Sequence, residues 1–571
     1  MKKINLYYLL LLGIVTLAFI LLIGISKSDS QTTDESVHLF AGYTYLTKND
    51  FRLDPEHPPF LKELAGLPLL FFRDIKVPID GLWDKAGNFY YDSWKEARGL
   101  GENFFYSVNS NADQILFWGR LPFILLTLFL GLFAYFWANR LYGQKAGIFA
   151  AFLILLMPNI LAHGHLINTD LGLTVFAFIS IYFWGKFLKS ASWRIGWANL
   201  SVAGLLLGLA FASKYTSVIL IPIIFLLAVA KLFTDDDFKN WRRYLLGFFG
   251  AGIIGFIIVW ASYGFTINLP PQPIGSFSQN IQMWASYNIP TVFDGIFAKA
   301  RPFLFPADFY KGLVLVVRHA LGGHGAYLLG ENSNFGWWYY FPVAIFYKTP
   351  LAFFAFLALA IGYFKRIRAK LIFDELILII APLVYLLISM SSKADLGVRH
   401  VLPIFPFLAV FAAKSINMIN FSSLKLWTKN RVKFLATVGF IVLVLWYLYS
   451  SLSNYPNYLS YFNEAAGGPS NGSKILTDSN LDWGQDIYRI KKYVAEHSDG
   501  KYSLTYPWDG EPALLYYGLN YPLVTPDDID VKGEVIISAT YARTDAYSWL
   551  WQFPHENITP GVLVFHLPDE S

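Results

Sequence analysis

Two adjacent acidic residues, Asp34 and Glu35, follow the first long apolar run of the sequence. A carboxylate at a membrane surface can act as a general base, removing a proton from a hydroxyl group while its oxygen attacks an electrophile. One base is enough for a single displacement that inverts the attacked carbon. The alternative is structural, because Thr33 or Asp34 could cap a helix that continues through the apolar residues after Glu35.

Several histidines could assist such a base or bind a metal ion. His38 lies four residues after Asp34, so on a helix the two side chains would share one face. Together with His57, His163 or His165 they could in principle hold a divalent cation. The sequence has no HExxH motif, and histidines near a membrane surface also serve as hydrogen-bonding groups. The sequence therefore leaves a divalent cation open.

Other charged residues stand at the edges of apolar runs. Asp170, Lys214, Arg399 and His400 do so, and ionisable groups at membrane depth are costly enough to suggest function. Lys214 and Arg399 could clamp a leaving phosphate, which gains negative charge as its bond breaks. They could equally be interfacial anchors whose long stems reach water.

Two further segments combine charge with a structural alternative. Glu56 and His57 precede two prolines, with Lys62 shortly after, so this stretch could be an active-site loop or a rigid turn. The acidic string from Asp478 to Asp486 lacks the spacing of a calcium loop, and the start of a capped helix explains it better.

The elements that carry these residues are membrane spans. Of the 571 residues, 55% are hydrophobic and only 15% are charged, and apolar runs of about 20 residues recur. We expect about eleven spans. They cover residues 4–25, 115–139, 144–161, 169–188, 198–213, 216–233, 243–265, 339–363, 373–391, 400–419 and 433–452. We expect the first to be a retained span, because it is long and lacks a signal-peptide cleavage site.

Lys and Arg residues concentrate in alternate loops, whereas the short loops on the opposite side hold only Lys214, Lys393 and Arg399. This asymmetry predicts a cytoplasmic N-terminus and an extracytoplasmic active site. Residues 1–452 would form the transmembrane domain, with outer loops 26–114 and 266–338. Residues 453–571 would form a small extracytoplasmic α/β domain, with strands in YSLTY, YPLVT, GEVIISATY and GVLVFHL and a helix after Trp483.

Composition excludes some classes of protein. The net charge of +5 is small and the basic residues sit at membrane edges, which argues against nucleic-acid binding. The absence of Cys excludes disulfides and a cysteine nucleophile. A transporter or flippase remains an alternative, although we find no internal repeat and the charges lie at helix ends. A non-catalytic receptor would leave the cluster around Asp34 without a purpose.

Several strings resemble glycosyltransferase family 39 and related protein O-mannosyltransferase-like enzymes of prokaryotes. They are Thr33-Asp34-Glu35 with His38, Phe51 to Pro59, Thr169-Asp170, Ser213 to Thr216, Trp337 to Pro342, Lys348-Thr349-Pro350, Gly397 to Pro403, Tyr461 to Glu464 and Asp482 to Asp486. Nearly the whole chain is covered, and each string alone is moderately specific.

The resemblance implies an all-α polytopic membrane bundle of the GT-C type, with amphipathic helices in the first outer loop. It implies a polyprenyl-phosphate-linked sugar as donor and inversion of the anomeric carbon. By similarity Asp34, Glu35 and Asp170 would be catalytic, while Lys214, Arg399 and His400 would lie toward the donor phosphate. The tail lacks the repeated motifs of the β-trefoil in eukaryotic relatives. The acceptor therefore stays open among a lipid, a cell-envelope glycan and a protein.

Overall fold

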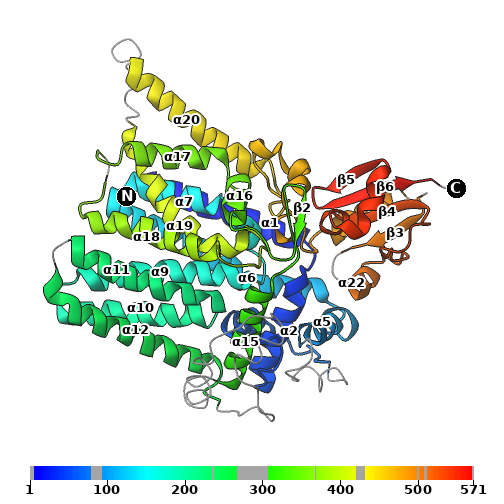
Figure 1. Ribbon diagram of the computed structural model, residues 1–571, viewed down its shortest axis with the longest axis horizontal. Coiled ribbons are helices and arrows are strands. Elements are labelled where there is room, and N and C mark those ends of the chain that lie inside the picture. Colours follow the sequence, from blue (N-terminus) through cyan, green and yellow to red (C-terminus); the bar gives the residue numbers. More distant parts are fainter. Residues whose placement is uncertain are drawn as a thin grey trace, which may run out of the picture.

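The computed structural model describes residues 6–78, 93–234, 237–266, 306–366, 368–419, 431–497, 500–506 and 511–568. In this part of the chain, nine helical segments are long and apolar enough to cross a membrane, and they form one bundle (Figure 1). They are α1 (Leu6–Ser28), α6 (Ala112–Tyr142), α9 (Thr169–Lys189), α10 (Trp193–Phe211), α11 (Leu220–Thr234) with the turn Tyr215–Ile219, α12 (Trp241–Ser262) with the turn Phe238–Asn240, α18 (Ile372–Ser389), α19 (Phe405–Ala413) within Val398–Met418, and α20 (Arg431–Leu452). The predicted multi-pass helical bundle is confirmed.

The two other expected spans are broken, and prolines explain both breaks. Residues 144–161 form α7 (Gln144–Leu155) and the short α8 (Pro158–His163), separated by a stretch that includes the extended Met157. Residues 339–363 form α16 (Tyr340–Lys348) and α17 (Leu351–Gly362), which bend by 105° at Thr349 and Pro350. The residue before a proline is pushed out of the helical region. Each of these two expected spans is therefore divided between two helices.

Short helices cover one end of the bundle. They are α2 (Thr33–Lys48), α3 (Phe60–Gly66), α5 (Ser93–Glu102) and α15 (Ala307–Gly322), with 3-10 and π turns at Leu67–Phe71 and Asn103–Ser107. The first three belong to the expected first outer loop. The helices α2 and α3 cross at Gly42, where an added Cβ would lie 1.7 Å from the Lys62 carbonyl oxygen. This close approach packs α2 directly against α3. The loop that joins the two helices, residues 49–59, lies beside this contact.

The tail carries a four-stranded sheet with the order β3-β4-β6-β5, at the end of the bundle opposite the start of α1 (Figure 1). Its elements are β3 (Tyr502–Thr505), β4 (Gly533–Ser538), β5 (His555–Thr559), β6 (Val562–Leu567), α21 (Ile487–Glu496), α22 (Glu511–Tyr516), α23 (Ala539–Ala542) and a 3-10 stretch at Asp545–Gln552. The strands β3 and β4 pair in parallel, whereas β6 is antiparallel to both β4 and β5. A separate hairpin pairs β1 (Ala326–Leu328) with β2 (Glu331–Ser333).

Three of the four predicted tail strands and the helix after Trp483 are confirmed. The fourth prediction was wrong, because YPLVT makes only an isolated bridge between Leu523 and Leu504. Pro522 lacks the N–H that a full ladder needs. The strand β5 was not predicted from the sequence.

Candidate active site

A cavity of about 430 Å³ lies at the end of the bundle where α2, α15 and the tail meet. The residues predicted from the sequence that line it are Asp34, His38, Glu56, His57, Lys214, Arg399 and His400. They come from α2, the loop after it, the end of α10 and the turn before α19. The fold thus brings together side chains that are several hundred residues apart in the sequence.

Asp34 lies in the first turn of α2, and its side chain keeps 17% of its surface exposed. One carboxylate oxygen, Oδ2, is 3.4 Å from Nη1 of Arg399. Asp34 therefore reaches the cavity and contacts a cation at its edge.

Arg399 is the centre of a charged cluster. Besides Asp34, its Nη1 lies 3.7 Å from Oδ2 of Asp170, and Oδ1 of Asp170 accepts a 2.5 Å hydrogen bond from Lys214 Nζ. Its Nε donates to Ser479 Oγ at 3.0 Å, and its guanidinium stacks 4.0 Å from the centre of the Trp483 ring. Asp170 is buried beneath the cavity wall and fixes two cations at its edge.

A second cluster surrounds His38. Its Nδ1 lies 2.9 Å from Oδ2 of Asp54, and the same oxygen lies 3.2 Å from Nζ of Lys62. Lys62 also donates to Tyr45 and to the carbonyls of Asp54 and His57, so it does not line the cavity. Burial opposes ionisation of Asp54, but Lys62 and His38 hold its pKa well below the ordinary value.

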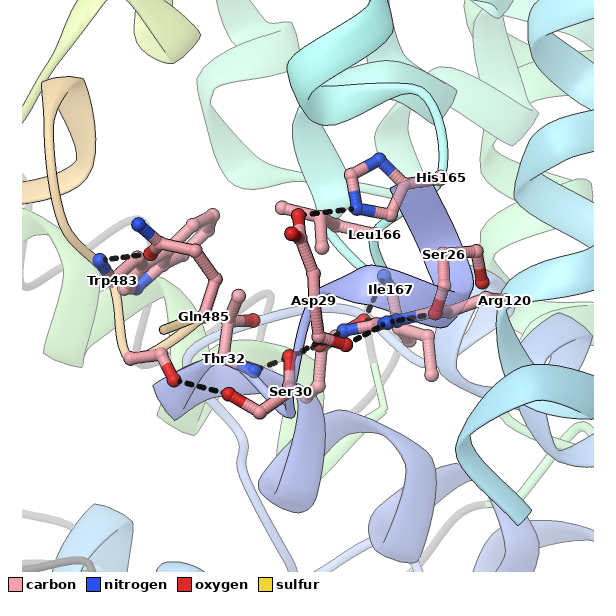
Figure 2. Close-up of polar contacts among 12 residues, drawn as sticks. Ser26, Asp29, Ser30, Thr32, Arg120, His165, Leu166, Ile167, Trp483 and Gln485 are labelled. Carbon is pink, nitrogen blue, oxygen red and sulfur yellow. Dashed lines mark hydrogen bonds and ion pairs between the residues drawn. The ribbon is translucent and has the colours of Figure 1, made fainter. Parts of the chain in front are cut away.

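Glu35 is wholly buried and does not line the cavity. Arg120 donates two hydrogen bonds to its carboxylate, at 2.8 and 2.6 Å, and the backbone N–H groups of Thr32 and Ile167 donate two more. The remaining N–H groups of Arg120 donate hydrogen bonds to the carbonyls of Ser26, Asp29 and Ser30 (Figure 2). Burial raises the pKa of Glu35, but Arg120 outweighs it and the pKa is lowered. The carboxylate of Glu35 is thus occupied by donors of the protein, and Glu35 does not line the cavity.

His163 and His165 lie behind the cavity wall. The ring centres of His163 and Trp483 are 6.3 Å apart. Nε2 of His165 is 3.2 Å from Oδ2 of Asp29 (Figure 2). Asp29 in turn pairs with Arg489 of the tail at 2.7 Å. His165 therefore takes part in holding the tail against the bundle.

Two parts of the cavity wall, from α15 and from the tail, were not predicted from the sequence. Asp478 and Trp483 line the cavity, together with His319 and His324, whose ring nitrogens are 2.9 Å apart. The helix start expected in the acidic string is confirmed, because Asp486 is the N-cap residue of α21, but its side chain makes no capping hydrogen bond there. The acidic string was a signal for this segment, although only the fold reveals that it forms a wall.

Within the described ranges, no group of three or more His, Cys, Asp or Glu side chains is arranged to hold a metal ion. The divalent cation stays a prediction, which turnover in the presence of a chelator tests.

Residues 108–260 match the profile of the family described as dolichyl-phosphate-mannose-protein mannosyltransferase. No curated protein matches the sequence. The structure of ArnT from Cupriavidus metallidurans bound to undecaprenyl phosphate is similar over 97% of both chains, with 12% identity and a TM-score of 0.50. The apo Archaeoglobus fulgidus oligosaccharyltransferase matches 90% of this chain and 60% of its own, with 14% identity and a TM-score of 0.46. The Saccharomyces cerevisiae Pmt1-Pmt2 complex bound to the sugar donor matches 46% and 33%, with 16% identity and a TM-score of 0.31. The predicted GT-C fold and the resemblance to this group of glycosyltransferases are confirmed.

Proposed function

We propose that this chain, whose residues 108–260 match a family of mannosyltransferases, transfers a sugar from a polyprenyl-phosphate carrier to a hydroxyl acceptor. The observation that carries the proposal is the contact between Asp34 and Arg399 at the edge of one cavity, with Lys214 beside them. Attack by a hydroxyl at a sugar carbon requires a base, and departure of a phosphate requires positive charge beside it. The cavity provides one base and two cations for these tasks. The similar ArnT structure holds bound undecaprenyl phosphate, which supports this class of donor.

Each charged group has a distinct part in this proposal. Asp34 takes the proton of the acceptor hydroxyl while its oxygen attacks the anomeric carbon, and the single displacement inverts that carbon. Arg399 and Lys214 stabilise the negative charge on the leaving phosphate, with His400 beside them in the cavity wall. Asp170 contacts both cations and sets their positions. The acceptor is a lipid, glycan or protein hydroxyl.

The proposed arrangement in the membrane follows the charge asymmetry of the loops. The N-terminus lies in the cytoplasm, and residues 453–571 lie outside with the cavity. The tail is then a soluble domain that also supplies part of the cavity wall, through Asp478 and Trp483.

The test uses the full-length protein in nanodiscs with a panel of undecaprenyl-phosphate-linked hexoses and pentoses. Released undecaprenyl phosphate is measured for the wild type, for Asp34→Asn and for Asp530→Asn, an exposed aspartate of the tail. We expect breakdown of at least one donor, a loss of roughly 100-fold or more in Asp34→Asn, and no change in Asp530→Asn. Turnover untouched by Asp34→Asn would refute the assigned base. Failure with every donor would refute the donor class, and loss of turnover with a chelator would establish a metal requirement.

A further inference from the structure

We propose that His38, held by Asp54, is a second proton carrier in the glycosyl transfer, placed one helical turn behind Asp34. The proposal rests on the function proposed above and deepens it. His38 and Asp34 both line the cavity, and their spacing of four residues puts them on one face of α2. Asp34 is also held by Arg399 at 3.4 Å, so a second group that takes the proton onward would restore this ion pair for the next turnover.

The contact with Asp54 fixes which nitrogen of His38 can act. Since the carboxylate of Asp54 can only accept, the 2.9 Å contact requires a proton on Nδ1 of His38. The other nitrogen, Nε2, then carries the lone pair that can receive a proton. An aspartate behind an imidazole holds the ring in one tautomer and stabilises the imidazolium once it forms.

The position of Asp54 is itself built into the fold. Its backbone has a φ of +46°, a left-handed conformation that aspartate tolerates better than most residues. Lys62 holds this turn by donating to the Asp54 carbonyl at 2.6 Å and to the His57 carbonyl at 2.7 Å. Asp54 and Lys62 are both 1% exposed. The turn alone does not require a buried carboxylate in contact with a histidine of the cavity wall. The contact between Asp54 and His38 therefore points to a role for the pair in the cavity.

The proton balance is complete in this scheme. The acceptor oxygen bonds to the anomeric carbon, and the bond from that carbon to the phosphate oxygen breaks with its electron pair on the phosphate. The acceptor proton passes to Asp34 and then to Nε2 of His38, from which it leaves to solvent between turnovers. Asp54 contacts His38 directly and also binds Lys62. The other ionisable side chains that line the cavity with His38 are Asp34, Glu56, His57, Lys214, His319, His324, Arg399, His400 and Asp478. His57 is the nearest ring, edge-on at 5.1 Å between centres.

The test combines kinetics with a measurement that needs no turnover. Donor breakdown is followed against pH for the wild type, His38→Gln and Asp54→Asn, with the exposed His497→Gln as the matched control. We expect a loss of roughly 100-fold in His38→Gln, partial rescue by free imidazole, and loss of the acidic limb of the rate profile. In Asp54→Asn the acidic limb of the rate profile should move to lower pH, because the imidazolium of His38 loses the negative charge of Asp54 beside it. A purely structural histidine would leave the pH profile unchanged and would not be rescued.

In parallel, protein labelled with ¹⁵N-histidine is titrated without donor, and His38→Gln identifies the His38 signal. We expect the tautomer with the proton on Nδ1, and its loss in Asp54→Asn. The opposite tautomer, or no effect of Asp54→Asn, would overturn the inference even if the donor class were wrong. A wild-type pH profile retained in His38→Gln would overturn it while the proposed glycosyl transfer stood.

Discussion

Asp34 and Glu35 are neighbours in the sequence, but their surroundings give them different tasks. Asp34 keeps access to the cavity, whereas Glu35 is closed off by Arg120 and two backbone N–H groups. We therefore expect Glu35→Gln to leave Arg120 as a buried charge without its partner, at a cost of about 3–5 kcal/mol in the free energy of unfolding.

The same change at Asp34 should behave in the opposite way. Asp34→Asn should keep the melting temperature close to that of the wild type while donor breakdown is lost. Thermal unfolding of both variants in detergent, read beside turnover, checks this contrast. Equal melting temperatures for the two variants would contradict the structural role of Glu35.

Arg399 makes contacts that a lysine cannot reproduce. Its planar group reaches two carboxylates, donates to Ser479 and stacks on Trp483. We expect Arg399→Lys to keep the positive charge but lower the rate of donor breakdown by roughly 100-fold, since a misplaced charge stabilises the leaving phosphate poorly. Steady-state kinetics measures the loss, and Lys393→Arg near the same cavity end serves as the control. A rate within a factor of two of wild type would mean that charge alone suffices.

At the scale of elements, the tail segment before α21 completes the cavity and must stay docked. Arg489 ties it down by pairing with Asp29 at 2.7 Å and with Asp486 at 2.6 Å. We expect Arg489→Gln to destabilise this contact by roughly 1–3 kcal/mol, because the two carboxylates then face each other with no cation between them. Hydrogen exchange should rise in residues 478–487, and donor breakdown should fall with it. The exposed Lys492→Gln is the matched control, and unchanged exchange in Arg489→Gln would show that other contacts hold the tail.

The sequence predicted the individual helices and strands better than the way in which they pack together. Apolar runs identified nine spans because membrane helices must satisfy their own backbone, but they could not reveal the bend at Thr349 and Pro350. Residue type pointed to Asp34, Lys214 and Arg399, which do gather at the cavity. Residue type could not separate Asp34 from Glu35, because the partner Arg120 lies 85 residues away. Nor could local pattern place Trp483 against Arg399, since only the docked tail creates that contact.

At the scale of the whole molecule, one buried acid should make stability depend on pH. Burial and the neighbouring Asp486 raise the pKa of Asp482 to about 7. In the unfolded chain the pKa of an aspartate is about 3.9, so the native state binds the proton of the Asp482 carboxyl more tightly than the unfolded state does. The free energy of unfolding therefore falls as pH rises from about 4 to 7. This penalty, the loss of stability when Asp482 ionises in the folded protein, is complete above pH 7.

Asp482→Asn should remove that penalty, because a neutral amide replaces the proton that the native state prefers. The difference in melting temperature between the variant and the wild type should grow between pH 4 and 7 and then level off. Asp530→Asn, on the surface, should give no such difference. A gap that does not vary with pH would contradict the assigned protonation.

The orientation of the whole molecule can be tested because the natural sequence has no Cys, so each introduced thiol is unique. Asp530→Cys in the tail and Glu331→Cys in the β hairpin lie on the side that should face outward, while Lys239→Cys and Lys365→Cys lie in loops that should face the cytoplasm. In intact cells, a membrane-impermeant maleimide should label the first pair at once and the second pair only after the membrane is opened. All four positions are exposed, so a failure to label reports sidedness and not burial. Labelling of Lys239→Cys from outside would reverse the orientation, and with it the side on which the cavity meets its donor.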